Sequence, residues 1–558
     1  MSSHDELHAL ADEYWESVLA AFPTYATLLG DRRFDDRLED VSGPAETALG
    51  ATWADQLARL DELDVASLDD TNRVTAALLQ AELARGVEGV ELRLAELASD
   101  QMEGVHANLL MTMPQISAPT PSSAEALVER YRQVGTLLDQ AAVRFRDGLA
   151  AGRTPARLTI ERSLNQVDGY LALDPADDPF VTFAGPPDWE GETAWRALLG
   201  SVAEEVVRPA FLRYRAVLAD ELLPVARPDD KAGLLWLGDD GAALYQALVR
   251  QHTTLDDLPA EEIHRLGLAS VERLTDEYAE VGSRLFGTRD QAEIFAQLQA
   301  DPALRYGSAD EIMAHVRRCV DGAWARIPEW FGSLPESPCD VVPVPDYLAA
   351  DAPTAYYFPP AADGSRPGAY CVNLHEPTRR GRFETASVAY HEGIPGHHLQ
   401  LTIATELTGV PSFQRLSLGN TAFAEGWALY TERLADEMGL YQDDIDRVGL
   451  LAGDSWRSCR LVVDTGLHAL GWSREHAVEY LMANVPASEH HIRSEVDRYV
   501  AMPAQALSYK VGQLEIQRLR ADVEARSNGG FDIKAFHDTV LGSGTVSLPV
   551  LRDLVAAL

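Results

Sequence analysis

The chain has 558 residues, of which 46% are hydrophobic and 24% charged, and its formal net charge is −40 at pH 7. It is long enough to bury a large core, whereas no apolar run reaches the roughly 18 residues that a membrane span needs. The acidic balance argues against nucleic acid and anionic membranes as partners, because both require basic patches. The four cysteines lack C-x-x-C spacing, which predicts free thiols.

The first segment, residues 3–22, has the pattern of an amphipathic helix. Ser3 and Glu6 have the spacing of a capping box, and the apolar residues that follow recur at helical intervals. The segment lacks the basic n-region and the apolar h-region of a signal peptide. We therefore expect a cytoplasmic protein.

Helical patterns separated by Pro, Gly and Asp continue to about residue 330. Residues 121–152 begin with capping-box spacing at Ser122 and Glu125 and predict one long helix. Residues 191–224 predict a second long helix. Pro209 should kink it, because proline has no backbone N–H to donate.

The character of the sequence changes near residue 335. Segments rich in β-branched and aromatic residues, 339–348, 354–360 and 368–374, predict short strands. Helical periodicity returns from about residue 383 to the end. These patterns predict a mainly α protein with one small β-sheet, divided into a mostly helical region, 1–334, and a C-terminal region, 335–558, that carries the sheet.

The segment HEGIPGHHLQ, residues 391–400, begins like the zinc-peptidase motif H-E-x-x-H but has Pro395 where the second histidine belongs. His397 and His398 follow instead, six and seven positions after His391. On an ideal helix His397 would lie far around the axis from His391, and His398 roughly 10 Å further along it. Pro395 and its flanking glycines predict a break that returns His397 to His391. The alternative is a helix that ends before the proline and two surface histidines.

Glu425 lies downstream in an apolar helical context. A buried carboxylate needs a partner, because an unpaired buried charge is costly, and zinc is one such partner. A catalytic zinc takes three His or carboxylate ligands, a set that His391, His397 and Glu425 can supply. Glu392, beside the first ligand, is then the candidate general base toward water. The alternative is an ion pair between Glu425 and Arg433 or another arginine.

Further site candidates come from the C-terminal region. His468 is a candidate oxyanion donor or ligand support, with a hydrogen-bonded structural histidine as an equal alternative. Tyr509 is a candidate oxyanion donor and the rare lysine Lys510 a candidate for holding a substrate carboxylate; a half-buried tyrosine and a solvated lysine are the alternatives. Asn373 ends the third predicted strand, which could align a peptide if it lay at a sheet edge. Arg493 is a further carboxylate-binding candidate, although such arginines more often form surface ion pairs.

Several segments together resemble the bacterial family known as domain of unknown function 885: TAYYFPPAADGSRPGAYCVNL, VAYHEGIPGHHLQ, AFAEGWALY, RLVVDTGLHALGW and PAQALSYKVG. The likeness extends more weakly to the N-terminal half and covers most of the chain. One departure is Ala504, where a glycine would be expected before Gln505. Some relatives look like lipoproteins, but the sequence shows no lipobox, so we do not expect that feature here.

This family resembles gluzincin-type zinc metallopeptidases. The likeness implies a large, predominantly helical fold with a deep cleft, one wall of which the region 1–334 would form, and the small sheet beside it. It also implies zinc as the cofactor. The residue roles that it implies are zinc ligation by His391, His397 and Glu425, general-base catalysis by Glu392, and transition-state donation by Tyr509.

We expect a zinc-dependent peptidase or amidohydrolase that acts on short peptides or N-acylated amino acids. A second class is a helical carboxylate/His dimetal oxidoreductase. Such proteins carry paired E-x-x-H motifs, and residues 261–264 supply one of them. A third is a catalytically silent helical binding protein, in which the IPG sequence merely ends a helix. The sequence leaves open the substrate, exo- versus endo-cleavage, the choice between His397 and His398, and the oligomeric state.

Overall fold

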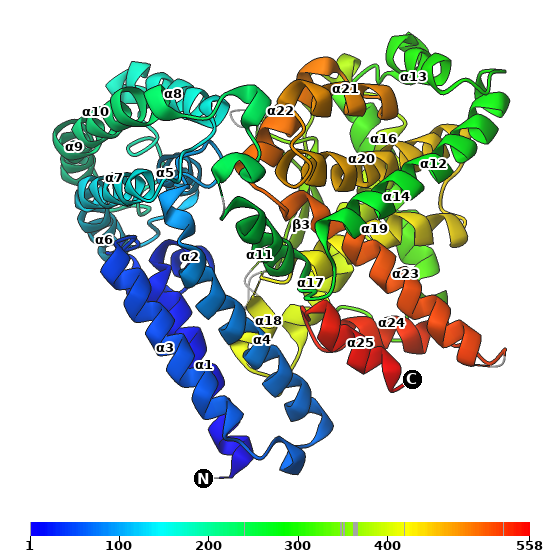
Figure 1. Ribbon diagram of the computed structural model, residues 1–558, viewed down its shortest axis with the longest axis horizontal. Helices are drawn as coiled ribbons and strands as arrows, with labels where there is room; N and C mark the ends of the chain where they lie inside the picture. The colour runs from blue at the N-terminus through cyan, green and yellow to red at the C-terminus, as the bar shows by residue number, and fades with distance from the viewer. Residues whose placement is uncertain are drawn as a thin grey trace.

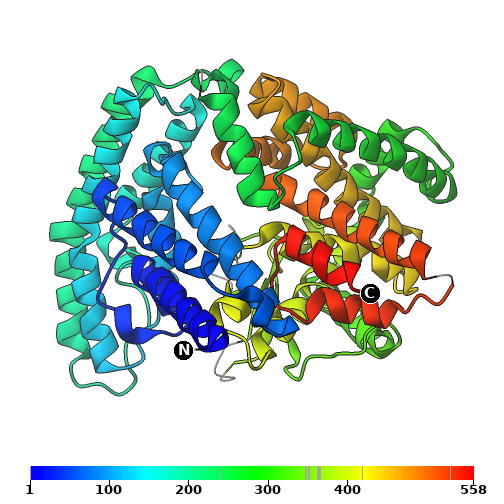
Figure 2. The same ribbon diagram turned by 60° about the horizontal axis from the view of Figure 1, so that its bottom comes forward.

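The computed structural model of the protein describes residues 2–238, 240–345, 349, 352–360, 366–417, 419–527 and 529–558. The fold is mainly α with one small sheet, as the sequence predicts. Helices from the first part of the chain gather on one side of the molecule, and helices from the second part gather on the other (Figures 1 and 2). Helix α11 lies between the two groups (Figure 1). No described helix is long and apolar enough to cross a membrane.

The helices of the first group cover the N-terminal part of the chain. They are α1 (Ser3–Ala21), α2 (Pro23–Leu28), α3 (Gly43–Asp61), α4 (Asp70–Leu92), α5 (Val105–Thr112), α6 (Pro121–Arg132), α7 (Val134–Ala150), α8 (Arg157–Ala172), α9 (Glu192–Val202) and α10 (Arg208–Ala216). The helices that follow them are α11 (Gly241–Thr253), α12 (Ala260–Leu285), α13 (Gln291–Ala300), α14 (Ala309–Arg326), α16 (Glu384–Glu392), α17 (His397–Glu406), α18 (Ser412–Leu416), α19 (Thr421–Glu437), α20 (Asp444–His468), α21 (Arg474–Asn484), α22 (Glu489–Ala501), α23 (Ser508–Arg526), α24 (Ile533–Leu541) and α25 (Leu548–Ala556).

Helices α1 and α6 both begin with a capping box, but the predicted pairs Ser3/Glu6 and Ser122/Glu125 are wrong. The box of α1 is formed by Ser2 and Asp5, and that of α6 by Thr120 and Ser123. In both places neighbouring residues also carry hydroxyl or carboxylate groups, so the spacing alone does not identify the pair that forms the hydrogen bonds.

The two long helical patterns are each divided. Residues 121–152 form α6 and α7 in close succession rather than one helix. Residues 191–224 form α9 and α10 joined by the π-helical turn Ala203–Val207. Pro209 lies in the first turn of α10, where its missing N–H is tolerated, so the predicted irregularity occurs just before it.

The core is not divided at the predicted boundary between 334 and 335. The larger cluster of buried apolar side chains includes Leu7 and Leu79 from the first group of helices and Trp427 and Leu551 from the second. A separate cluster fills the space among α5 to α10. All four cysteines are free, as the sequence predicts.

The sheet consists of β1 (Cys339–Pro343), β2 (Ala355–Phe358) and β3 (Gly368–Val372), in the order β1–β3–β2. β3 pairs in parallel with β1 and antiparallel with β2. The three predicted strands are confirmed, although residues 346–348 of the first segment lie outside the described residues. Because β3 is the central strand, both of its edges are paired, and the prediction that this strand could align a peptide at a sheet edge is wrong.

Candidate metal centre

The chain breaks its helical path beside the first motif histidine. Residues 393–396, the sequence GIPG, separate α16 from α17. A Cβ on Gly396 would lie 1.9 Å from the carbonyl oxygen of His391, so only glycine fits at this close approach. The indole Nε1 of Trp427 donates a 3.0 Å hydrogen bond to the carbonyl oxygen of Pro395 and ties the break to α19. The predicted interruption of the helix is therefore present.

Three side chains from α16, α17 and α19 meet beside this break. The Nε2 atoms of His391 and His397 lie 3.4 and 3.5 Å from the same oxygen, Oε2 of Glu425. The centroids of the two imidazole rings are 4.9 Å apart. In the part of the chain that the structure describes, this is the only cluster of three or more His, Cys, Asp or Glu side chains arranged to hold a metal ion.

The donor set and its distances fit a tetrahedral zinc ion. Zinc–ligand bonds of about 2.0–2.1 Å place two tetrahedral ligands roughly 3.3–3.4 Å apart. The separations of 3.4 and 3.5 Å between the histidine nitrogens and Glu425 match this value. The Oε2 atom of Glu425 is buried and has no hydrogen-bond partner within the described ranges. A cation shared with the two histidines would compensate this otherwise unfavourable burial.

His397, rather than His398, is the residue that reaches His391. The ring of His398 is fully buried, its Nδ1 lies 2.9 Å from the hydroxyl of Tyr357, and its edge packs against Trp324. Burial lowers the pKa of His398 to about 4. His398 therefore belongs to the packing between α17 and the sheet.

Glu432 orients the first histidine, and it was not among the residues predicted from the sequence. Its Oε1 lies 2.8 Å from Nδ1 of His391, and its Oε2 accepts a 2.6 Å hydrogen bond from the hydroxyl of Ser387. Metal-binding histidines commonly pair their second nitrogen with such a carboxylate. Glu432 lies seven residues after Glu425, two turns along the same face of α19, and this spacing is the signal that could have identified it.

The charges of the cluster shift its pKa values. Burial lowers the pKa of His391, but Glu425 and Glu432 on its two sides outweigh burial and raise it to about 9. Burial raises the pKa of Glu425, but His391 and His397 hold it well below its usual range. Burial also raises the pKa of Glu392, although the charges of His391 and His397 lower it in part. A half-buried carboxyl with a raised pKa is suited to proton transfer near neutral pH.

A cavity of about 440 Å³ opens beside Glu392, with walls from α16, α20 and α22 and from the chain that leads into β2. Tyr509 lies at this side of the cluster. Arg460 lines the cavity, and its guanidinium carbon is 4.5 Å from the centroid of the Tyr509 ring. Burial and the negative charge of Glu425 raise the pKa of Tyr509, so its hydroxyl stays protonated and can donate.

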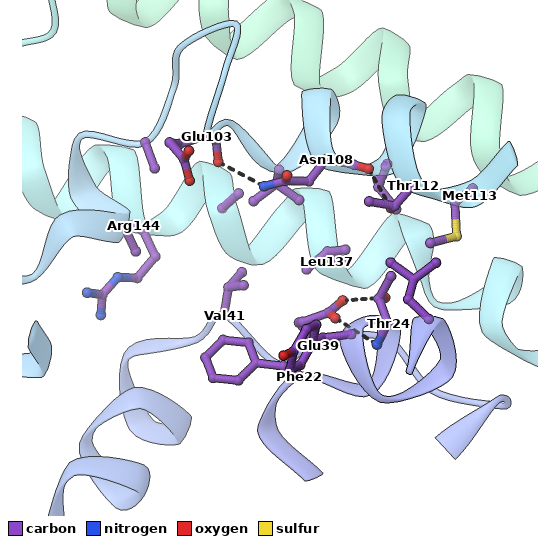
Figure 3. Close-up of a pocket in the computed structure, with 17 residues that line it drawn as sticks. Phe22, Thr24, Glu39, Val41, Glu103, Asn108, Thr112, Met113, Leu137 and Arg144 are labelled. Atoms are coloured by element: carbon purple, nitrogen blue, oxygen red, sulfur yellow. Dashed lines mark hydrogen bonds between the residues drawn. The ribbon is translucent and has the colours of Figure 1, made fainter. Parts of the chain in front are cut away.

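A second cavity, of about 490 Å³, lies among α2, α5 and α7 (Figure 3). Its lining is mostly apolar, and its polar groups bond one another or residues outside the cavity. Glu39 accepts hydrogen bonds from the backbone N–H and the hydroxyl of Thr24, and Asn108 donates to the carbonyl oxygen of Glu103. Because an active site needs convergent polar groups that are free to meet a ligand, the cavity beside Glu392 is the better candidate.

Two predicted site residues hold the backbone instead. Nδ1 of buried His468 accepts a 3.1 Å hydrogen bond from the N–H of Leu234, and its Nε2 lies 3.0 Å from the carbonyl oxygen of Tyr499. With both nitrogens engaged, His468 has a structural role rather than the predicted catalytic one. Asn373 is likewise buried, and its Nδ2 donates to three backbone carbonyl oxygens just before β2, so it shapes that loop rather than binding substrate.

Two arginines discussed from the sequence form other ion pairs. Arg493 pairs with one glutamate of α21 and one of α22, at 2.8 Å each, and does not line the cavity beside the cluster. Arg433, the alternative partner for Glu425, pairs with Glu277 and Asp454 at 2.6 Å each. Glu425 therefore faces the two histidines and not Arg433.

Lys510 is fully buried and forms an ion pair with Asp454, so it is not placed to bind substrate as predicted. Lys510→Met should lower the free energy of unfolding by about 1–3 kcal/mol, because Asp454 keeps Arg433 but loses one charge-assisted hydrogen bond. Denaturant unfolding measures this loss. Lys231→Met, at an exposed lysine, is the control and should change stability by less than about 0.5 kcal/mol. Unchanged stability of Lys510→Met would contradict the structural role.

Two solved bacterial structures share this fold. A protein from Colwellia psychrerythraea described as a "putative lipoprotein" matches with a TM-score of 0.91 and 25% identity, over 100% of this chain and 99% of its own. A "putative lipoprotein of unknown function" from Shewanella oneidensis matches with a TM-score of 0.78 and 18% identity, over 98% of this chain and 99% of its own. No curated protein matches the sequence.

These neighbours correct the location expected from the sequence. Both are described as lipoproteins, and a lipoprotein is attached to a membrane by covalently bound lipid. The expectation of a cytoplasmic protein is therefore contradicted. That expectation rested on the hydropathy of residues 3–22, which describes helix α1 and does not decide where the protein is located.

The family likeness extends over nearly the whole chain. The sequence profile of one family, described as "Bacterial protein of unknown function (DUF885)", matches residues 23–555. The match includes the helices that carry His391, His397 and Glu425 and the segment that carries Tyr509. The protein belongs to the bacterial DUF885 family.

Proposed function

We propose that the protein is a zinc-dependent hydrolase that cleaves amide bonds in short peptides or N-acylated amino acids. The observation that carries the proposal is the approach of His391 and His397 to one unpartnered oxygen of Glu425, at 3.4 and 3.5 Å. Zinc held by these three residues supplies a Lewis acid for the scissile carbonyl and lowers the pKa of water. Glu392 follows the first ligand and lines the adjacent cavity.

The residues around the cluster supply the proton transfers. Hydrolysis adds OH to the acyl carbon and H to the nitrogen of the cleaved bond. Glu392 can accept the proton that water loses and return it to the leaving nitrogen, since its raised pKa brings it closer to neutral pH. Tyr509 is the candidate donor to the carbonyl oxygen as this oxygen gains negative charge. Glu432 keeps His391 oriented for ligation.

Metal analysis and hydrolysis assays together test the proposal. We expect one zinc per chain by elemental analysis and release of free amine from N-acetylated amino acids or dipeptides. A chelator should stop the reaction, and added zinc should restore it. Absence of hydrolysis from the zinc-loaded protein across both substrate classes would contradict the proposal.

The dimetal alternative has less support in the structure. His264, from the one E-x-x-H segment, has its Nδ1 2.8 Å from the hydroxyl of Thr465. A second candidate metal cluster is not found within the ranges that the structure describes. Iron in place of zinc on elemental analysis would favour this alternative. A melting temperature that does not change when zinc is added would favour a catalytically silent binding protein.

Glu432→Gln should weaken zinc binding without removing a ligand. The amide can still accept a hydrogen bond from His391 but carries no charge, and loss of such a supporting carboxylate reduces metal affinity by about 10- to 100-fold. Competition with a chromogenic chelator measures this affinity. Glu437→Gln removes an exposed carboxylate from the same helix, where it pairs with Arg520, and should leave the affinity unchanged. Equal zinc affinities for the two variants would contradict the orienting role.

A further inference from the structure

Two arginines of α20 line the cavity beside Glu392 with N–H groups that have no partner. Nε of Arg457 and Nη1 of Arg460 are buried and donate to no acceptor among the described residues. Arg460 is only 8% exposed. Buried donors normally find an acceptor, because leaving one unpaired is unfavourable. Each of these two lining residues therefore keeps a buried N–H donor that no described acceptor uses.

The rest of the Arg460 guanidinium is held in place. Its Nε donates a 3.1 Å hydrogen bond to the hydroxyl of Tyr499, and its Nη2 donates a 3.0 Å bond to Glu495. Its carbon lies 4.5 Å from the centroid of the Tyr509 ring. These contacts fix the orientation of the group and leave Nη1 as its one nitrogen without an acceptor among the described residues.

Arg457 connects the cavity wall to the candidate metal centre. Its Nη2 lies 3.8 Å from Oε1 of Glu432, the oxygen that contacts His391 at 2.8 Å. Arg457 and Arg460 are three residues apart on α20 and so share one face of that helix. Arg457 therefore lies on the Glu432 side of His391, and Arg460 lies one turn further along α20 at the wall of the same cavity.

Three carboxyl groups also line the cavity, and arginines counter their charges. Glu495 pairs with Arg460 at 3.0 Å and with Arg498 at 3.1 Å. The charge of Glu384 is countered in part by Arg380 and Arg305 outside the cavity and by Arg457, which lines it. Glu392 is the proposed proton carrier. Nε of Arg457 and Nη1 of Arg460 still have no acceptor among the described residues, and charged N–H donors of this kind suit an anion.

We propose that Arg457 and Arg460 bind the carboxylate of the substrate. The substrates would then be short amides that carry a free carboxylate, such as peptides with a free C-terminus or N-acyl amino acids. This inference rests on the proposed hydrolase function and names its substrate class. Two guanidinium groups can share the two oxygens of a carboxylate through charge-assisted hydrogen bonds. The cavity of about 440 Å³ has the size of a small-molecule site and not of a groove for a folded protein.

A matched pair of substrates tests the inference. N-acetyl-alanyl-alanine and its C-terminal amide differ only in the charge of the terminal group. We expect the zinc-loaded protein to cleave the acid with a kcat/KM at least about tenfold higher than that of the amide. Arg460→Gln should lower kcat/KM for the acid by about 10- to 100-fold and change that for the amide little. Because Arg457 also lies 3.8 Å from Glu432, the effect of Arg457→Gln is read from the ratio of acid to amide cleavage, which should fall by a similar factor. Arg493→Gln, at a surface arginine outside the cavity, should leave both values unchanged.

Binding to the metal-free protein separates this inference from the hydrolase proposal. In calorimetric titrations, N-acetyl-alanyl-alanine should bind at least about tenfold more tightly than its amide, and Arg460→Gln should remove this difference. Acid-selective binding without hydrolysis by the zinc-loaded protein would overturn the proposed function and keep the carboxylate site. Equal binding and equal cleavage of acid and amide would overturn the carboxylate site and keep the hydrolase.

A purely structural role for the arginines gives a different result. If they serve only to pack against Tyr509 and Glu495, the variants will melt at a lower temperature with an unchanged ratio of acid to amide, which overturns the inference. If Arg460→Gln does not fold, Arg457→Gln and the acid-to-amide ratio of the unmodified protein decide the question.

Discussion

Glu392→Gln should reduce turnover by a factor of about 10² to 10⁴ while the protein keeps one zinc per chain. Glutamine has nearly the same shape as glutamate but can neither accept the proton from water nor return it to the leaving nitrogen. Proton transfer by a positioned side chain contributes about this factor to enzymatic rates. Because the ligand set is His391, His397 and Glu425, the substitution leaves the proposed metal ligands in place.

The measurement pairs kcat with the zinc content of the same preparation. Glu479→Gln is the matched control, since Glu479 is an exposed carboxylate on α21 away from the cavity. Hydrolysis by Glu392→Gln at the rate of the unmodified protein would rule out the proton-transfer role. Loss of zinc together with activity would show that Glu392 supports the metal instead.

Local sequence patterns predict whether a segment is a helix or a strand better than they predict which segments it packs or pairs with. β-Branched and aromatic residues between turn residues predict three short strands before α16, and the structure confirms them. The order β1–β3–β2 could not be predicted in the same way, because it depends on pairing between segments separated by other chain. β3 was considered as an edge strand and is the central one.

The site shows the same division between local and distant information. The unusual spacing in HEGIPGHHLQ and the apolar surroundings of Glu425 are local signals, and they pointed to the three residues that the structure brings together. Lys510 and His468 were misjudged because their partners, Asp454 and the carbonyl oxygen of Tyr499, lie far away in sequence. Local patterns do not reveal whether a lysine is solvated or buried in an ion pair.

The arginines show a third case. Arg460 begins the segment RLVVDTGLHALGW, in which the sequence indicates His468 and not the arginine as a candidate site residue. Only the arrangement of α20, α22 and α23 shows that Nη1 of Arg460 has no acceptor among the described residues. Which N–H groups of an arginine have an acceptor can be seen only in the three-dimensional structure.

His397→Phe should remove zinc binding, and His398→Phe should not. His397 contributes one of the three clustered donor atoms. Loss of a supporting group lowers metal affinity by about 10- to 100-fold, and the loss of a ligand in His397→Phe should lower it further. At a zinc concentration of 100 times Kd, a ligand stabilises the native state by about 2.7 kcal/mol. Zinc should therefore raise the melting temperature of the unmodified protein and leave that of His397→Phe unchanged.

His398→Phe is the matched control, since it places the same ring one residue further along. It removes the contact between Nδ1 and the hydroxyl of Tyr357 and should lower the free energy of unfolding by about 1 kcal/mol. Its melting temperature should still rise with zinc, because the ligand cluster is intact. If His398→Phe loses zinc and His397→Phe keeps it, the ligand set is wrong, and the break at GIPG has no role in bringing His397 to His391.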